Sequence, residues 1–232
     1  MHQKKKHSKQ GEADVCPLLR RVALVLMVGY FLATTLFSKL EYYNFLTLET
    51  DPTVETFCEQ PCQIEIVEEE EMKKAIFDMW VRYKDGREEL QEVKYTKELS
   101  GDSKSAIRSQ EQIRRQRRWC DDNNISFAVR TEEDLLHGDY LIQNLSVIAG
   151  LVRRYTPYDA DYYSKLVIRC IEDANYAKRK KVLVNDLIMK ELLPVSNEWA
   201  HLAYMYVKGL IDLNIGSKPL DLRTEVRLAC QN

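Results

Sequence analysis

Apolar and polar positions repeat with different periods in the two parts of this chain. Segments 63–67 and 75–81 carry apolar residues in the short runs typical of β-strands, and a third strand-like segment follows around residues 91–94. From residue 160 onward, apolar residues recur with helical spacing over residues 160–177 and 183–193, and Pro194 separates a third helix over residues 198–210. The pattern predicts a strand-rich region followed by a mostly helical one.

A turn between two of the strand-like segments brings polar residues together. Lys84-Asp85-Gly86-Arg87 contains an Asp-Gly pair between apolar runs, which is a strong hairpin signal. The strand that carries Asp78 is therefore expected to lie beside the strand that carries Glu92. Because residues two apart on a strand point to the same face, Glu92 and Lys94 are predicted neighbours.

A third carboxylate is predicted at the start of a helix. The residues Ser38-Lys39-Leu40-Glu41 form the S-x-x-E pattern of a helix N-terminus. One interpretation gives Glu41 the ordinary role of binding the backbone of the capping residue. The other makes Glu41 a partner of Asp78 and Glu92.

These residues together indicate a metal-dependent nuclease. Carboxylates brought close together repel unless a divalent cation lies between them, and hard oxygen ligands suit Mg²⁺ or Mn²⁺. Lys94 would then face a substrate phosphate or orient the attacking water. The alternative is structural: Asp78 as an acid at a sheet edge, and Glu92 with Lys94 as an ordinary ion pair.

Overall composition is that of an ordinary globular protein, so local charge is more informative. The 232 residues are 45% hydrophobic and 30% charged, with a formal net charge of −2. Two basic clusters are candidates for contacts with DNA phosphates, and a solvated surface is the alternative for both. They are Arg114, Arg115, Arg117 and Arg118 in a helix expected over 106–119, and Lys178, Arg179, Lys180 and Lys181.

The region after about residue 155 is expected to be a separate module. Thr156-Pro157 marks the boundary, and segments 213–215 and 220–223 flank the turn-like Gly216-Ser217-Lys218-Pro219. Three helices followed by such a hairpin predict a winged-helix module, whose usual task is to bind DNA or a partner protein.

The apolar segment 22–37 raises the question of a membrane. It has no charged residue and follows basic residues, but its sixteen residues are fewer than the roughly twenty that a spanning helix needs. It also contains Gly29, and no clear cleavage site follows it. We expect a buried strand there and no role for a membrane, and a membrane-anchored protein is the alternative.

In its motifs the chain resembles the TnsA-type endonucleases of bacterial heteromeric transposons, which have a restriction-enzyme-like PD-(D/E)xK core. The resemblance covers most of residues 20–150 and departs from many members in having Phe77 where they have Pro. Some members also have Gln in place of Glu92. The motifs that carry it are Gly29-Tyr30-Phe31, Ser38-Lys39-Leu40-Glu41, residues 49–61, Phe77-Asp78, Glu92-Val93-Lys94, residues 125–135 and Asn144-Leu145.

This resemblance implies an α/β fold: a mixed sheet flanked by helices, followed by the winged-helix module. The expected divisions are a basic tail over 1–19, the nuclease domain over 20–155 and the C-terminal domain over 156–232. Glu41, Asp78, Glu92 and the Val93 carbonyl would bind Mg²⁺ or Mn²⁺, and Lys94 would act at the scissile phosphate.

The resemblance also implies a reaction and partners. The protein would be a bacterial cytoplasmic enzyme that cleaves the non-transferred (5′) strand at transposon-end DNA. Its partners would be a DDE-type, TnsB-like transposase and an AAA+, TnsC-like regulator. The alternatives are another PD-(D/E)xK nuclease, for restriction or junction resolution, and a non-catalytic winged-helix protein that binds DNA or a partner.

Overall fold

The computed structural model describes residues 38–61, 63–68, 71–156, 158–177 and 181–229. The basic tail, the apolar segment 22–37 and the Gly29-Tyr30-Phe31 motif lie outside these residues, as do Lys178, Arg179 and Lys180. In the part of the chain that is described, no helix is both long enough and apolar enough to span a bilayer.

A mixed four-stranded sheet forms the centre of the first region. Its strands are β1 (Val54–Glu59), β4 (Met79–Tyr83), β5 (Glu88–Val93) and β6 (Ser126–Arg130), in the order β1-β4-β5-β6. β1, β4 and β5 pair antiparallel, whereas β5 and β6 pair parallel. The predicted Asp-Gly hairpin is confirmed as the connection between β4 and β5, where Gly86 has a φ of +86°.

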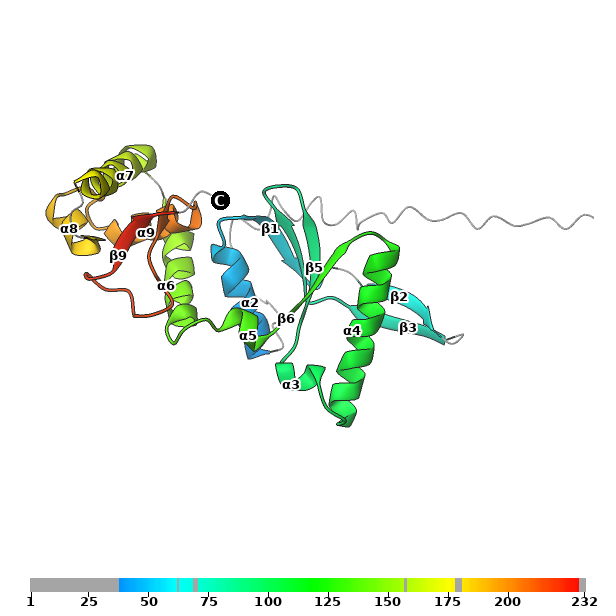
Figure 1. The fold of residues 1–232 in the computed structure, drawn as a ribbon. Coiled ribbons are helices and arrows are strands. Elements are labelled where there is room, and N and C mark those ends of the chain that lie inside the picture. The colour runs from blue at the N-terminus through cyan, green and yellow to red at the C-terminus, as the bar shows by residue number, and fades with distance from the viewer. Residues whose placement is uncertain (1–37, 62, 69–70, 157, 178–180, 230–232) are drawn as a thin grey trace, which may run out of the picture.

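Helices cover both faces of this sheet because its strands are apolar on both sides. Met79 and Val81 pack with Leu48 of α2 (Lys39–Thr50) on one face. Trp80, between them in sequence, packs toward Cys120 of α4 (Lys104–Asp122) on the other face. Figure 1 shows α2 and α4 on opposite sides of the strands, which is the expected mixed α/β arrangement.

A second hairpin leaves the sheet beside α4. β2 (Gln63–Glu68) and β3 (Glu71–Ile76) pair only with each other and project past α4 (Figure 1). The prediction that Asp78 lies inside one continuous strand over 75–81 is wrong, because Asp78 falls between β3 and β4. The chain passes there from the projecting hairpin into the sheet, and the fully buried Phe77 fixes the junction against the rings of Trp119 and Phe127.

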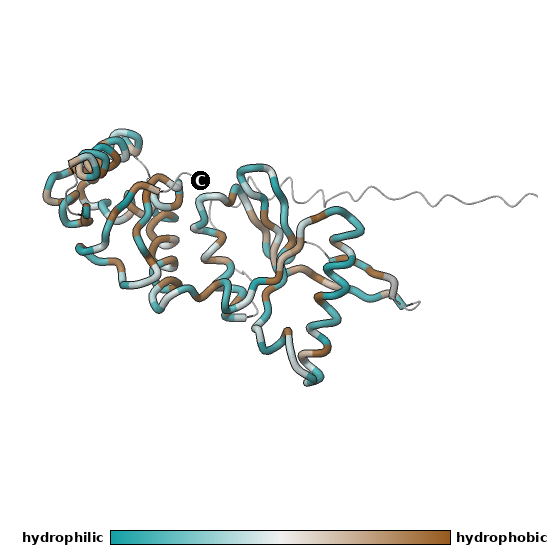
Figure 2. The backbone as a smooth tube through the Cα atoms, viewed as in Figure 1, coloured by the Kyte–Doolittle hydropathy of each residue, from teal (hydrophilic) through white to brown (hydrophobic). Residues whose placement is uncertain are grey.

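Three further helices follow the sheet strands in the first region. α3 (Thr96–Leu99) and α5 (Glu132–Leu135) are single short turns, and α6 (Leu141–Arg154) is a longer amphipathic helix. α6 packs against α2 and also against α9 of the C-terminal region. Figure 2 shows extended hydrophobic stretches along α6, whereas α4 is hydrophilic over most of its length.

The C-terminal region combines helices with a small antiparallel sheet. Its elements are α7 (Ala160–Tyr176), β7 (Val182–Leu183), α8 (Val184–Met189), α9 (Glu198–Val207), β8 (Ile211–Asp212) and β9 (Glu225–Leu228). The strands lie in the order β7-β9-β8. A single apolar core joins α6, α7, α8, α9 and these strands and includes Leu46 of α2.

The positions predicted for the two C-terminal strands are wrong. Residues 213–215 and 220–223 lie in the loop between β8 and β9. The physical reason is the Asn144 side chain on α6, which donates hydrogen bonds to the carbonyls of Ile215 and Lys218 and accepts one from the Leu220 amide. These backbone groups are therefore bound by a side chain from a distant part of the sequence.

Candidate active site

Asp78 is held in place by its backbone and by its side chain. Its amide donates to the Gln91 carbonyl, and its carbonyl accepts from the Gln60 amide. The carboxylate oxygen Oδ2 accepts a hydrogen bond of 2.7 Å from the Val93 amide. The start of β4 and the end of β5 thus fix the Asp78 carboxylate next to the Glu92-Val93-Lys94 segment.

Strand alternation decides which way the acid and the lysine of this segment point. Leu90 belongs to the apolar cluster on the α4 side of the sheet, and Glu92, two residues on, points to the same side. Glu92 is fully buried there, and its Oε1 lies 2.6 Å from the Lys94 Nζ. The predicted pairing of Glu92 with Lys94 is therefore confirmed.

Two glutamines of α4 hold Glu92, and the sequence analysis missed both. Gln112 Nε2 donates to Glu92 Oε1 over 2.7 Å, and Gln116 Nε2 donates to Glu92 Oε2 over 2.6 Å. Gln116 also donates to the Ile76 carbonyl. The available signal was their spacing of four residues, which places both amides on one side of a helix that is otherwise rich in arginine.

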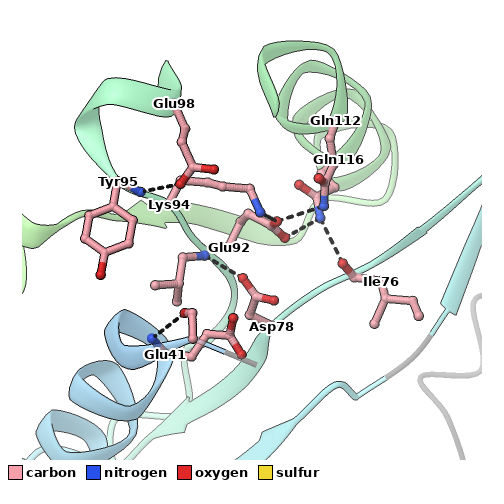
Figure 3. A network of polar contacts seen from close by, with 11 residues as sticks. Glu41, Ile76, Asp78, Glu92, Lys94, Tyr95, Glu98, Gln112 and Gln116 are labelled. Carbon is pink, nitrogen blue, oxygen red and sulfur yellow. Dashed lines mark hydrogen bonds and ion pairs between the residues drawn. The ribbon is translucent and has the colours of Figure 1, made fainter. Parts of the chain in front are cut away.

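Glu41 approaches from the opposite face of the sheet. α2 begins as predicted, with Ser38 Oγ accepting a hydrogen bond from the Glu41 amide. Leu40, next to Glu41, is buried with Val93 and Leu135, which anchors this end of the helix on β5. In Figure 3 the Glu41 carboxylate points toward Asp78, with Glu92 and Lys94 beyond it.

The electrostatics of this cluster favour a bound cation. Burial, together with the Glu92 and Glu41 charges, raises the pKa of Asp78 to about 7. Burial also raises the pKa of Glu92, although Lys94 and Gln116 oppose this shift. Burial lowers the pKa of Lys94, but the stronger combined effect of the Glu92 and Asp78 charges raises it, so this ammonium is strongly favoured.

Another acid not identified from sequence lies near the cluster. Glu59, at the end of β1, is half-buried, and its pKa is raised by burial and by the Glu41 charge. The carboxylates of Glu41, Asp78 and Glu92 therefore lie in a region of excess negative charge with Lys94 as its counterion.

The donor set suits a magnesium ion that retains water ligands. Among the described residues, no three His, Cys, Asp or Glu side chains form a ready-made metal cage. Mg²⁺ seldom uses such a cage, because it usually keeps several waters and binds one or two carboxylates. Asp78 with Glu41 fits that requirement. Each oxygen of Glu92 accepts a hydrogen bond, from Gln112 or Gln116, and a carboxylate oxygen has a second lone pair that a cation could use.

The described residues of the two predicted basic clusters have different surroundings. On α4, Arg115 lies beside the β2–β3 hairpin, whereas Arg117 lies over the Phe127 ring. In the second cluster, Lys181 lies 2.6 Å from Glu225 Oε2. Lys181 therefore has a structural partner on β9.

Comparison with known proteins identifies the segment that contains this cluster except for Glu41. Residues 51–132 match the family described as TnsA-like endonuclease N terminal. This match contains Asp78, Glu92, Lys94 and both glutamines of α4, and it confirms the resemblance found from the motifs. No curated protein matches the chain.

Proposed function

We propose that this chain, whose residues 51–132 belong to the TnsA-like endonucleases, is a metal-dependent DNA endonuclease of a heteromeric transposase. The observation that carries the proposal is the buried cluster in which Asp78, Glu92 and Lys94 meet at the ends of β4 and β5. Its action would be to cleave the non-transferred (5′) strand at transposon ends.

The proposed roles of the residues follow from their surroundings. A Mg²⁺ or Mn²⁺ ion bound by Asp78 and Glu41 would lower the pKa of water and offset negative charge on the scissile phosphate. Glu92 and the Val93 carbonyl are further proposed ligands from the adjoining strand. Glu92 keeps the Lys94 ammonium within 2.6 Å of its own carboxylate, which orients that charge toward the cluster. Lys94 would stabilise charge on the phosphate or position the attacking water.

For the C-terminal region we propose a winged-helix module over residues 156–232. Its support is the order α7-β7-α8-α9-β8-β9 with the strand arrangement β7-β9-β8. α9 is buried along much of its length, including His201, Leu202 and Met205, and it packs against α6. That burial favours a role in binding a partner protein over insertion of α9 into a DNA groove.

Proposed partners are a DDE-type transposase, which would cut the other strand, and an AAA+ regulator. The full chain produced together with both proteins is expected to co-purify with at least one of them. Recovery of the chain without either partner would remove this part of the proposal.

The test of the central function is nicking of transposon-end DNA in Mg²⁺ or Mn²⁺, with the cognate transposase present. Wild type should cut the non-transferred strand, whereas Asp78→Ala and Lys94→Ala should not. Equal cutting by the variants would show that this cluster is not the active site. An active transposase without any cut by wild type would favour a non-catalytic binding protein instead.

A further inference from the structure

A groove of about 480 Å³ lies between α4 and the β2–β3 hairpin. Lys74 and Gln63 contribute to it from the hairpin, and Arg108, Gln112 and Arg115 contribute from α4. The three α4 residues are four and three positions apart, so they form one stripe along the helix. We call this feature the basic groove.

The charge of the basic groove is positive along its lining. None of the described residues that line it is acidic. Among the described residues, Glu65 lies 3.7 Å from Lys74, and Glu111 lies 3.9 Å from Arg115. The Glu65–Lys74 pair is exposed, and such pairs are weak in water, so Lys74 and the exposed Arg108 are the cations that we consider for binding an anion.

The basic groove is directly connected to the candidate active site. Gln112 lines the groove and donates to Glu92 Oε1. Ile76 also lines it, and its carbonyl accepts from Gln116, which donates to Glu92 Oε2. The groove therefore contacts Glu92 through these two glutamines, and Figure 3 shows Gln112 and Gln116 with their bonds to Glu92 and to the Ile76 carbonyl.

We propose that the basic groove binds a backbone phosphate of the DNA strand that the active site cuts, next to the scissile phosphate. This inference rests on the proposed nuclease function and adds the path of the strand. Gln112 lines the groove and donates to Glu92, which pairs with Lys94, so a phosphate in the groove would be a neighbour of one at Lys94. Arginine guanidinium groups suit phosphate oxygens because they donate paired hydrogen bonds. The adjoining amides of Gln63 and Gln112 can donate to the same group.

DNA fits the groove better than an acidic peptide does. Peptide recognition ordinarily uses apolar pockets for side chains in addition to charge. Ala75 and Ile76 supply the only apolar side chains among the described lining residues, and Ala75 is buried. A row of cations and amides that continues from a nuclease centre is instead suited to a sugar–phosphate backbone.

The test is DNA binding by the full chain carrying Lys74→Ala and Arg108→Ala together. Both side chains are exposed, so the fold should survive, and an unchanged melting temperature checks this. The control is Lys84→Ala with Arg87→Ala, which removes the same charges at the β4–β5 turn. The β4–β5 turn is separated from Asp78 by the length of β4, which is roughly 15 Å at about 3.3 Å per residue.

Binding of a fluorescent duplex of arbitrary sequence is followed by anisotropy in Ca²⁺, at several salt concentrations. The Lys74/Arg108 variant should bind more weakly, and its slope of log affinity against log salt should be smaller by about 1, because one phosphate contact is lost. The control variant should retain the wild-type slope. Equal slopes for wild type and the Lys74/Arg108 variant, or no DNA binding by wild type, would overturn the inference.

Cleavage in Mg²⁺ is measured separately, so the two ideas fail in different ways. Wild type that binds DNA through the groove but never cuts would contradict the proposed nuclease function and leave the groove assignment standing. Wild type that cuts, with a Lys74/Arg108 variant that binds and cuts equally well at every salt concentration, would contradict the groove assignment alone.

Discussion

Both regions of the molecule bury polar side chains, but they do so in opposite ways. In the first region, which holds the sheet β1-β4-β5-β6, the buried polar groups centre on the Glu92 carboxylate, which is surrounded by Lys94, Gln112 and Gln116. In the C-terminal region the corresponding group is His201, which hydrogen-bonds to Tyr155 and lies 3.4 Å from the Ser164 hydroxyl. Burial lowers the pKa of His201 to about 4, so the ring is neutral at neutral pH.

The contrast is between a carboxylate cluster that we propose as an active site and polar groups that hold the C-terminal core together. The side-chain amide of Asn144 hydrogen-bonds through both its nitrogen and its oxygen, to three backbone groups of one loop. The side-chain amide of Gln116 hydrogen-bonds through its nitrogen, but its Oε1 is buried and has no hydrogen-bond partner among the described residues. An unpaired buried acceptor costs free energy, and so do carboxylates that raise one another's pKa. The first region therefore keeps an unpaired acceptor and a carboxylate with a raised pKa, whereas the Asn144 side chain is paired at both ends.

The largest expected effect is that the two regions give opposite dependences of stability on pH. The folded-state pKa of Asp78 is about 7 and its ordinary value is 3.8, so its contribution to stability is present below pH 3.8 and is lost as pH rises through 7. The loss is on the order of 4 kcal/mol at most. His201 has the reverse sign, because its folded pKa of about 4 lies below 6.5, so its contribution is lost as pH falls from 6.5 through 4.

Chemical denaturation of metal-free protein across this pH range would measure both effects. Asp78→Asn should remove the loss of stability on the alkaline side, and His201→Gln should remove the loss on the acid side. Added Mg²⁺ should stabilise wild type more at pH 8 than at pH 5 and should not stabilise Asp78→Asn. If the free energy of unfolding depends on pH identically in wild type and Asp78→Asn, the pKa of Asp78 is not raised in the metal-free fold.

The next effect is expected where Asn144 of α6 binds the β8–β9 loop of the C-terminal region. Asn144→Ala removes three hydrogen bonds to the β8–β9 loop, at about 1 kcal/mol each, so unfolding should become easier by about 3 kcal/mol. Asn123→Ala is the matched control, because it loses one exposed bond to the Trp119 carbonyl. Urea denaturation would measure both. If Asn144→Ala and Asn123→Ala lower the free energy of unfolding equally, Asn144 does not organise the loop.

A smaller effect is expected from Gln116→Leu, which should slow DNA cleavage about tenfold, equivalent to about 1.4 kcal/mol. The leucine keeps the volume but leaves Glu92 Oε2 without the 2.6 Å donor that positions it. The Mg²⁺ concentration for half-maximal rate should change as well, which loss of packing alone would not cause.

Gln110→Leu is the control, because Gln110 is exposed on the same helix and donates to the Gly101 carbonyl. Unchanged rate and Mg²⁺ dependence in Gln116→Leu would exclude a positioning role.

Local features of this fold were predictable from the sequence because their causes lie within a few residues. Ser38 caps α2 through the amide three residues later, and Gly86 permits the turn that pairs β4 with β5. Strand alternation gave the Glu92–Lys94 pair. In each case one short segment contains both interacting groups.

Features that depend on distant segments were missed. Gln116 reaches Glu92 across 24 positions, and Asn144 reaches Leu220 across 76. No period in the sequence relates such residues, so neither the support of Glu92 by α4 nor the loop that replaces the expected strands was predicted. The interruption of the strand at Asp78, between β3 and β4, was not predicted for the same reason, because it depends on where the β2–β3 hairpin packs beside α4.

The most direct test of the central claim is binding of Mn²⁺ to the full chain, followed by electron paramagnetic resonance. Wild type should bind Mn²⁺, Mg²⁺ should compete for the same site, and Asp78→Asn should lose the binding while it remains folded. His201→Gln should bind as wild type does. Equal Mn²⁺ binding by wild type and Asp78→Asn would contradict the assignment of this carboxylate cluster as the metal site of a nuclease.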